Sequence, residues 1–314
     1  MVMRIFTKAV KNKYSMDNQS KVKEIAGKHL GKVGGAGYSD QYNRDLLVKV
    51  PRKLNRETYN LSGNEFVGVD TWNAYEVSAI TTKGQPVAGM LKIVCPSNSE
   101  FHVESKSIKL YLNSLNMTKI GDTAKDCIKG IEATVKRDLD ELLETNSTVS
   151  FYADDSETTP LSFKDYEDVA EIANLDEIDF TSFKSDASQL EAQDNDEVEE
   201  LRYKSNLLRS NCRVTNQPDW GDVFIYLRGK KLPTAASLAK YIVSHRTVSH
   251  FHEEICEMVF AHLCEAFQPD QLMVACLYTR RGGLDINPIR ATHSSLIPEF
   301  FTNPDFTIQK TLRQ

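Results

Sequence analysis

The spacing of apolar residues changes in a regular order along the first half of the chain. Alternation of apolar and polar positions predicts strands, and apolar spacings of three and four predict helices. Gly and Pro between two alternating runs predict a turn. The predicted elements are a strand over residues 72–81, a turn over 82–86, a strand over 87–94, helices over 104–115 and 122–143, and a strand over 148–153.

The second half repeats this order of elements. The pattern predicts a strand over residues 223–228, a turn at 228–230, a helix from Pro233 to His245, a second helix through Phe267, and a strand over 271–279. We expect Ser249 to cap the second helix, since Ser oxygens accept from free helical N–H groups. Two antiparallel sheets, each backed by a helix pair, would make an α+β protein.

These elements predict four segments. They are an N-terminal lead-in over residues 1–60, a first module over 61–153, an acidic connection over 154–204 and a second module over 205–314. Residues 151–200 contain 17 of the 44 acidic residues and only 2 of the 38 basic ones. The acidity is therefore local, and the rest of the chain has an excess of basic residues that could meet an anionic ligand. We expect residues 194–200 to be a solvated linker.

Several classes of protein are disfavoured. No run of 18 apolar residues is present, so we expect no membrane span. The N-terminus lacks the apolar core of a signal peptide. Six cysteines without framework spacing indicate free thiols in a reducing cytoplasm. The glycine-rich stretch over residues 27–37 lacks the spacing of a dinucleotide or nucleotide phosphate loop, so we expect a flexible connection there.

One stretch concentrates residues that could perform chemistry. Cys212 lies between Arg209 and Arg213, and Asp219 follows after Gln217 and Pro218. A thiolate is a nucleophile, and neighbouring positive charge lowers the pKa of a thiol. A nearby carboxyl can take or return a proton. A buried structural cysteine is the plainer interpretation of Cys212 alone.

A second group of polar residues is predicted at a helix start. His252 and Glu253 follow Phe251, and a carboxylate there could accept two adjacent N–H donors of a purine-like ring. A capping glutamate and a partly buried histidine are the structural alternative. His252 and Cys256 are one helical turn apart, but a further ligand is lacking, so we predict no metal.

Five strings together resemble the bimodular nitrile reductases that convert 7-cyano-7-deazaguanine to 7-aminomethyl-7-deazaguanine in the queuosine pathway. They are VPRKLNR at 50–56, VESKSIKLYLNSLN at 103–116, SNLLRSNC with NQPDWG at 205–221, FHEEICE at 251–257 and YTRRGGLDINP at 278–288. The resemblance covers roughly residues 28–295. It does not extend clearly to the N-terminal extension or the acidic middle.

The resemblance implies a fold and a set of roles. The fold would be tandem tunnelling-fold modules. Cys212 would be the nucleophile, with Asp219 and His252 transferring protons. Substrate would contact Val103, Glu104, Ser105, Phe251, His252 and Glu253, and NADPH would contact Ser105, Lys106, Arg281 and Gly282.

The same resemblance implies partners. The small molecule 7-cyano-7-deazaguanine would be the substrate, the enzyme would be a cytoplasmic homodimer, and no nucleic acid, membrane or metal would be needed. Two other functions remain open: an amine or amidino transferase acting on the same nitrile without NADPH, and a non-catalytic purine or pterin binder. Nitrile-dependent NADPH consumption and formation of a covalent adduct separate the three.

Overall fold

The computed structural model describes residues 21, 24–27, 39, 41–153, 160–311 and 314. The glycine-rich connection expected over residues 27–37 lies mostly outside these residues. The chain divides into two compact units, one formed by Met1–Gly63 with Ala74–Ser156 and the other by Asn64–Asn73 with Glu157–Gln314.

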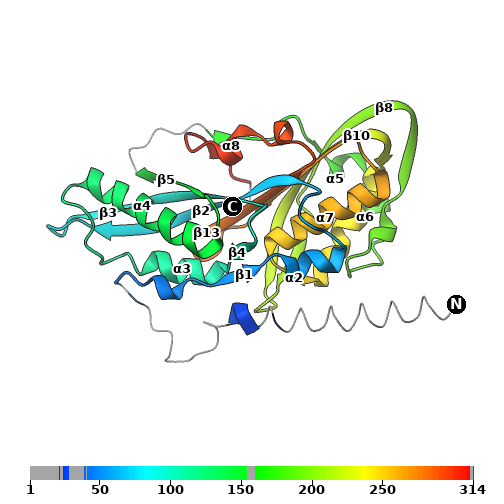
Figure 1. Cartoon of the computed structure of the whole chain (residues 1–314). Coiled ribbons are helices and arrows are strands. Elements are labelled where there is room, and N and C mark those ends of the chain that lie inside the picture. Colours follow the sequence, from blue (N-terminus) through cyan, green and yellow to red (C-terminus); the bar gives the residue numbers. More distant parts are fainter. Residues whose placement is uncertain (1–20, 22–23, 28–38, 40, 154–159, 312–313) are drawn as a thin grey trace. The chain divides into compact units, whose positions relative to one another are not determined.

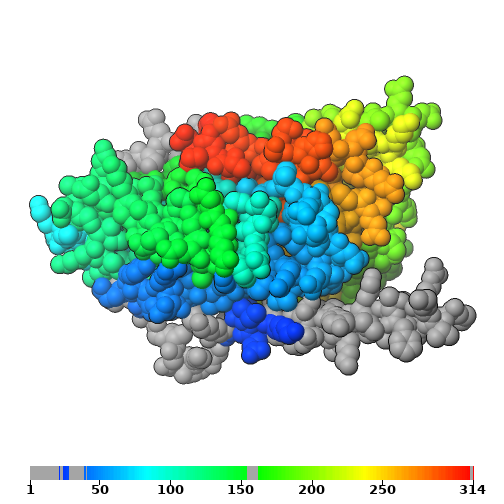
Figure 2. Space-filling model, viewed as in Figure 1, coloured from blue at the N-terminus to red at the C-terminus, as the bar shows by residue number. Residues whose placement is uncertain are grey.

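Unit 1 is an antiparallel sheet with two long helices. Its elements are β1 (Lys49–Pro51), α2 (Lys53–Arg56), the second part of β2 (Val67–Ile80), β3 (Pro86–Pro96), β4 (Phe101–Val103), α3 (Ser105–Asn113), α4 (Ala124–Leu143) and β5 (Thr148–Ala153). Strands β3 and β5 pair antiparallel, and α4 packs against both. In Figure 2, the green atoms of α4 lie on the face of this unit that is turned toward the viewer.

The helices of unit 1 form where the apolar spacing predicted them. Thr123 caps α4 by accepting from the N–H of Asp126, and the buried stripe runs through Ile131, Val135 and Leu139. The stripe also includes Cys127 and Leu143, whereas Ile128 and Leu142, at the neighbouring positions, are only half-buried. Each fully buried aliphatic side chain contributes about 1.5–3 kcal/mol to folding. Most charged residues of α4 lie outside this buried stripe, as in an amphipathic helix, but Asp138 is fully buried.

Unit 2 is built around a longer, mainly antiparallel sheet (Figure 1). Its elements are the first part of β2, β6 (Pro160–Leu161), β7 (Glu167–Asp168), α5 (Val169–Ile172), β8 (Ala192–Ser205), β9 (Arg209–Cys212), β10 (Pro218–Pro233), α6 (Ala235–Val243), β11 (Ser249–His250), α7 (His252–Phe267), β12 (Gln271–Tyr278), β13 (Leu284–Ala291), α8 (Glu299–Thr302) and β14 (Thr307–Ile308). Strand β10 is central and pairs with β8, β9 and β12.

The two faces of the β10 strand bury different partners. Helix α7 packs against β10, β12 and β13. Aromatic residues form a cluster that joins Phe224 and Tyr226 of β10 to Phe163, Phe300 and Phe301, and the rings of Phe163 and Phe224 stack with centroids 4.2 Å apart. Since side chains alternate along a strand, Phe224 and Tyr226 share one face and Val223 and Ile225 share the other.

The α+β class is confirmed, because both units contain antiparallel strand pairs and α-helices. Three local predictions are wrong. Residues 194–200 belong to the exposed strand β8 rather than a linker, because backbone pairing with β10 orders them without burying their acidic side chains. The predicted turn at 228–230 is a bulge within β10, where the register shifts between Gly229 and Lys231. Pro233 ends β10, and Thr234 caps α6.

The predicted cap of α7 is also wrong. Phe251, not Ser249, is the N-cap residue, and Ser249 lies in β11. The carboxylate of Glu254 accepts the N–H of Phe251 at 3.0 Å, which is half of a capping box. The capping role that we considered for Glu253 therefore belongs to Glu254.

Candidate active site

Backbone pairing in unit 2 brings Cys212 and Asp219 to the same side of the sheet. Ser210 in β9 is opposite Asp219 in β10, and Asn211 is opposite Pro218. Residues directly opposite each other project to one side, and Cys212 is two residues beyond Ser210. Cys212 is therefore the diagonal neighbour of Asp219. Its thiol is buried, with 8% of the residue exposed, and Asp219 is 3% exposed.

A closed loop holds Cys212 at the end of its strand. The N–H of Cys212 donates to the carbonyl of Gln217 at 2.7 Å, and the N–H of Asn216 donates to the carbonyl of Cys212 at 2.9 Å. Asn216 has a φ of 56°, a left-handed conformation that Asn tolerates better than most residues. These bonds fix the chain between the cysteine and the start of β10.

Helix α7 brings His252 to the same place. Its Nε2 atom lies 3.5 Å from Oδ2 of Asp219. The imidazole stacks on the ring of Tyr278, with centroids 3.8 Å apart and planes 8° apart. Tyr278 pairs with Gly221, where a Cβ atom would be 3.0 Å from the tyrosine ring, so glycine leaves room for this stack. Asp219, His252 and Tyr278 thus form one continuous group.

Arg281 contacts the same carboxylate from another side. Its Nη1 atom pairs with Oδ1 of Asp219, and its Nη2 atom donates to Oε1 of Gln217 at 2.8 Å. In this structure the guanidinium therefore holds Asp219, whereas the resemblance implied cofactor contact. Gly282 and Gly283 follow with φ values of 57° and 82°. Positive φ at both central residues is what a two-residue type I′ hairpin turn requires, so the turn itself favours glycine at both positions.

The two arginines that flank Cys212 have other partners. Arg213 pairs with Glu254 at 2.5 Å, and both side chains are buried. Arg209 donates to the carbonyl of Arg246 and lies over the ring of Trp220. The charge of Arg213 is therefore offset by a carboxylate, which differs from our expectation that both arginines would act on the thiol directly.

The remaining residues implied for substrate in unit 2 are at the first turn of α7. Phe251 and Glu253 are 7% and 3% exposed. Sequence reasoning missed two neighbours, Tyr278 and Glu254. The glutamate three residues after an N-cap was a readable signal for Glu254, but nothing in the sequence pointed to the ring stack of Tyr278 on His252.

The implied residues of unit 1 surround the start of α3. Val103 ends β4 and is buried, and Glu104 caps α3 by accepting the N–H of Ser107 at 2.8 Å. The hydroxyl of Ser105 donates to the same carboxylate at 3.4 Å. Lys106 is half-buried in the first turn. A helix start with a nearby lysine suits an anionic group, although the buried Glu104 already satisfies one backbone donor there.

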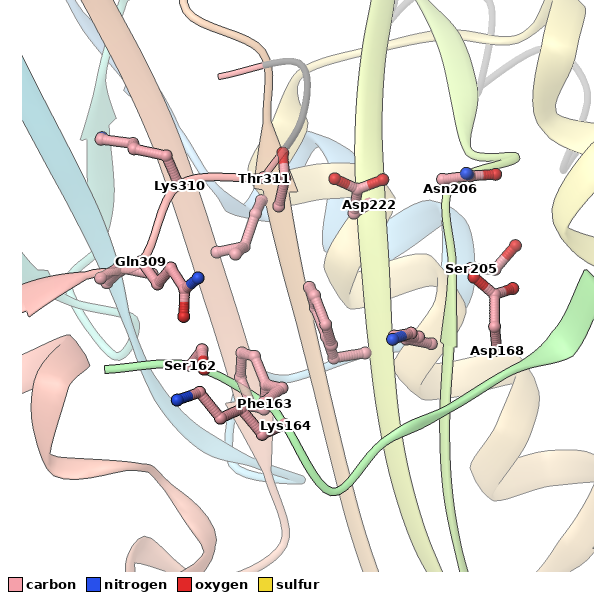
Figure 3. Close-up of a pocket in the computed structure, with 14 residues that line it drawn as sticks. Ser162, Phe163, Lys164, Asp168, Ser205, Asn206, Asp222, Gln309, Lys310 and Thr311 are labelled. Atoms are coloured by element: carbon pink, nitrogen blue, oxygen red, sulfur yellow. The ribbon is translucent and has the colours of Figure 1, made fainter. Parts of the chain in front are cut away.

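A cavity of about 340 Å³ lies elsewhere in unit 2 (Figure 3). Asp222, Asn206, Ser205 and Asp168 line one part of it, and Lys310 lies across from them. Side chains alternate in direction along a strand, and Asp222 is three residues after Asp219 in β10, so the two side chains project to opposite faces. The cavity is therefore separate from the group around Cys212.

Among the described residues, no three His, Cys, Asp or Glu side chains are grouped so that they could hold a metal ion. His252 contacts Asp219, whereas the thiol of Cys256 lies 3.4 Å from the carbonyl of Val274.

In the described part of the chain, no helix has both the length and the apolar character of a membrane span.

Comparison with known proteins matches both halves of the chain. Residues 38–151 match the family model described as nitrile reductase, 7-cyano-7-deazaguanine-reductase N-term, and residues 218–296 match the model described as QueF-like protein. Among solved structures, the apo form of the archaeosine synthase QueF-Like covers 32% of this chain and 96% of its own. That alignment has a TM-score of 0.27 and 17% identity, a likeness too weak to carry an argument.

Three relatives share the printed name NADPH-dependent 7-cyano-7-deazaguanine reductase. The protein of Hahella chejuensis is 41% identical over 271 residues, which are 84% of this chain and 93% of the relative. The protein of Coxiella burnetii is 38% identical over 275 residues, 87% and 91% of the two chains. That of Legionella pneumophila is 39% identical over 267 residues, 82% and 87%. The chain belongs to the family of NADPH-dependent 7-cyano-7-deazaguanine reductases.

Proposed function

We propose that this protein reduces the nitrile of 7-cyano-7-deazaguanine to an aminomethyl group with NADPH, supplying the queuosine pathway. Relatives that carry this activity in their names match over nearly their whole length. One structural observation supports it most. Asp219 is diagonal to Cys212 in the sheet and lies 3.5 Å from Nε2 of His252, so a nucleophile and two proton-transfer groups are together.

Cys212 acts first as a nucleophile. Its thiolate adds to the nitrile carbon, one π bond of the nitrile breaks, and the nitrogen takes one proton to give a covalent thioimide. The nitrile is a poor hydride acceptor and the thioimide is a better one, so this step makes the reduction easier, which is the general advantage of covalent catalysis.

Asp219 and His252 handle the protons. Asp219 accepts the thiol proton, and His252, whose Nε2 atom lies 3.5 Å from Oδ2 of Asp219, delivers a proton to the nitrogen. Arg281 holds the carboxylate of Asp219 through Oδ1, which leaves Oδ2 toward His252. The reaction thus uses one carboxylate oxygen for orientation and the other for proton exchange.

Recognition of the base falls to buried polar and aromatic groups. The carboxylate of Glu253 accepts adjacent N–H donors of the deazaguanine edge, and Phe251 covers the ring. Both residues are buried at the start of α7, where the cap formed by Glu254 fixes the backbone. Val103, Glu104 and Ser105 are the substrate contacts that we assign to unit 1.

NADPH would contact Ser105, Lys106, Arg281 and Gly282. The half-buried Lys106 at the start of α3 fits an anionic group, and the turn at Gly282 lets a ligand approach the backbone closely. When bound, the cofactor supplies the hydrides that a nitrile needs to become an amine. Arg281 must exchange its contact with Asp219 for one with the cofactor if it does both tasks.

The protein acts on a free base, so the proposal requires no contact with nucleic acid or membrane. We assign it to the cytoplasm, where free thiols persist. We also propose a homodimer, on the basis of the family resemblance alone.

Cys212→Ala tests the function. Wild-type protein incubated with the nitrile and no cofactor should gain the mass of one substrate molecule, and with NADPH it should oxidise the cofactor. Cys212→Ala should lose both, whereas Cys264→Ala, at a half-buried thiol of the same unit, should keep both. NADPH oxidation by Cys212→Ala would refute the mechanism. An adduct without NADPH oxidation would indicate the transferase, and binding without an adduct would indicate the non-catalytic binder.

A further inference from the structure

Glu254 contacts three groups at once. Its Oε1 atom accepts from Nη1 of Arg213 at 2.5 Å. Its Oε2 atom accepts the N–H of Phe251 at 3.0 Å and lies 3.1 Å from Nδ1 of His250. Glu254 and Arg213 are 5% and 4% exposed. One buried carboxylate therefore uses both oxygens to join segments that are far apart in the sequence.

Each of these contacts is next to a residue of the proposed mechanism. Arg213 directly follows Cys212, and His250 is opposite Cys212 in the parallel pair of β9 and β11. Phe251 directly precedes His252 and Glu253, which begin α7. Glu254 thus joins the segment that carries the nucleophile to the helix turn that carries the proton donor and the base-binding carboxylate.

The energetics of a buried ion pair favour a geometric role. Removing two charges from water costs several kcal/mol per ion, so such a pair adds little net stability, and an apolar pair of similar volume is often as stable. Breaking one side leaves an uncompensated buried charge and disturbs what surrounds it. The Arg213–Glu254 pair lies between the segment of Cys212 and the first turn of α7. Its value to the protein is therefore the alignment of these two segments rather than stability.

We propose that Glu254, through Arg213, is a positioning residue that sets the first turn of α7 against the sulfur of Cys212. This role rests on the proposed function, because it concerns the rate at which that sulfur adds to the nitrile. Glu254 does not touch the substrate in this account. It keeps His252 and Glu253 in the place from which they act, and errors of about 1 Å in such placement can cost on the order of 100-fold in rate.

The test compares Glu254→Gln, Arg213→Met and the double variant. Gln still accepts the N–H of Phe251, as capping boxes allow, but it does not pair with a guanidinium as an ion. Each single variant should slow cofactor-free adduct formation, followed by intact mass, by about 10- to 100-fold. The double variant should be slowed no more than the slower single variant, because the two side chains act through one contact, and losses that multiply would mean that they act separately. The rate at which iodoacetamide alkylates Cys212 should change much less than the rate of adduct formation, since the thiol itself stays in place.

Glu257→Gln is the matched control. Glu257 is on the same helix, 2% exposed and paired with Arg290 at 2.9 Å, but one turn further from the helix start. It should lower the melting temperature while leaving the adduct rate near that of wild type. If Glu254→Gln behaves in the same way, the positioning role is refuted. If Glu254→Gln does not fold, Arg213→Met and the double variant decide the question by the same rates.

Experiments on the wild-type protein distinguish a failure of the proposed function from a failure of the positioning role of Glu254. Wild-type protein that reacts with iodoacetamide but forms no nitrile adduct would refute the proposed function, and the positioning role with it. Wild-type protein that forms the adduct, with a Glu254→Gln rate unchanged, would refute only the positioning role.

Discussion

Oδ2 of Asp219 lies 3.5 Å from Nε2 of His252, while the other oxygen of the same carboxylate is held by Arg281. The residues come from three separate segments: β10, the start of α7 and the turn after β12. A carboxylate with one oxygen anchored and the other beside an imidazole is oriented for proton exchange. The relationship also accounts for Tyr278, whose stacked ring fixes the plane of the imidazole.

Asp219→Asn should reduce turnover while leaving the fold intact. The amide can still lie between Arg281 and His252, but it cannot accept the thiol proton. We expect nitrile-dependent NADPH oxidation to fall by about 10²- to 10⁴-fold, the usual contribution of a positioned acid or base. The steady-state rate of NADPH oxidation checks the loss of turnover, and a melting curve of the same sample checks that the fold is intact. Wild-type turnover in Asp219→Asn would show that another group takes the proton.

Arg281→Met should change the chemistry at Cys212 even when no cofactor is present. The guanidinium pairs with Asp219 and donates to Gln217 at 2.8 Å, so its loss frees the carboxylate to move. We expect the cofactor-free adduct to form about tenfold more slowly, by loss of orientation. Arg280→Met, at the neighbouring position, is the control. An unchanged adduct rate together with a raised KM for NADPH would instead limit Arg281 to cofactor binding.

The sequence predicted regular elements better than it predicted their partners. Strand β5 and helices α3 and α4 follow from local periodicity, which each element carries in its own residues. The acidic strand β8 could not be read this way, because its order comes from pairing with β10 and its exposed side chains show no apolar alternation.

The site shows the same limit. Cys212, Asp219 and His252 were recognisable as residue types and by family resemblance, and their roles stay predictions. Their mutual placement depends on register and long-range pairing, such as Ser210 opposite Asp219. The pairing of Arg213 with Glu254 spans 41 residues, so a positive charge beside a cysteine in the sequence did not mean a positive charge free to act on the thiol.

Tyr111→Phe should destabilise unit 1 more than Tyr42→Phe. Both hydroxyls donate to Oδ2 of Asp138, at 2.7 Å and 2.8 Å, and Asp138 is fully buried. Tyr111 is 0% exposed and Tyr42 is 38% exposed, so water can replace only the second donor. We expect a loss of about 2 kcal/mol for Tyr111→Phe and under about 1 kcal/mol for Tyr42→Phe. Urea unfolding of both variants measures the difference, and equal losses would contradict this account.

His245 should make the protein sensitive to acid. Its side chain is fully buried, and this desolvation, helped by the nearby His262, lowers the pKa of His245 from 6.5 to about 4. Nδ1 lies 3.0 Å from the carbonyl of Tyr241, which keeps the ring in place. Between these pKa values the unfolded chain binds a proton that the folded protein does not. The free energy of unfolding should therefore fall as the pH drops from 6.5 to 4, by up to about 3 kcal/mol.

A comparison with His245→Asn isolates this contribution. Asn can donate to the same carbonyl but does not titrate, and His262 is common to both proteins. The variant should be less stable than wild type at pH 7, because the smaller side chain leaves space in the core. That difference in unfolding free energy, measured by urea titration at several pH values, should shrink steadily below pH 6.5 as wild type alone takes up the proton penalty. Two curves that stay parallel from pH 7 to pH 4 would mean that the pKa of His245 is the same in the folded protein as in the unfolded chain.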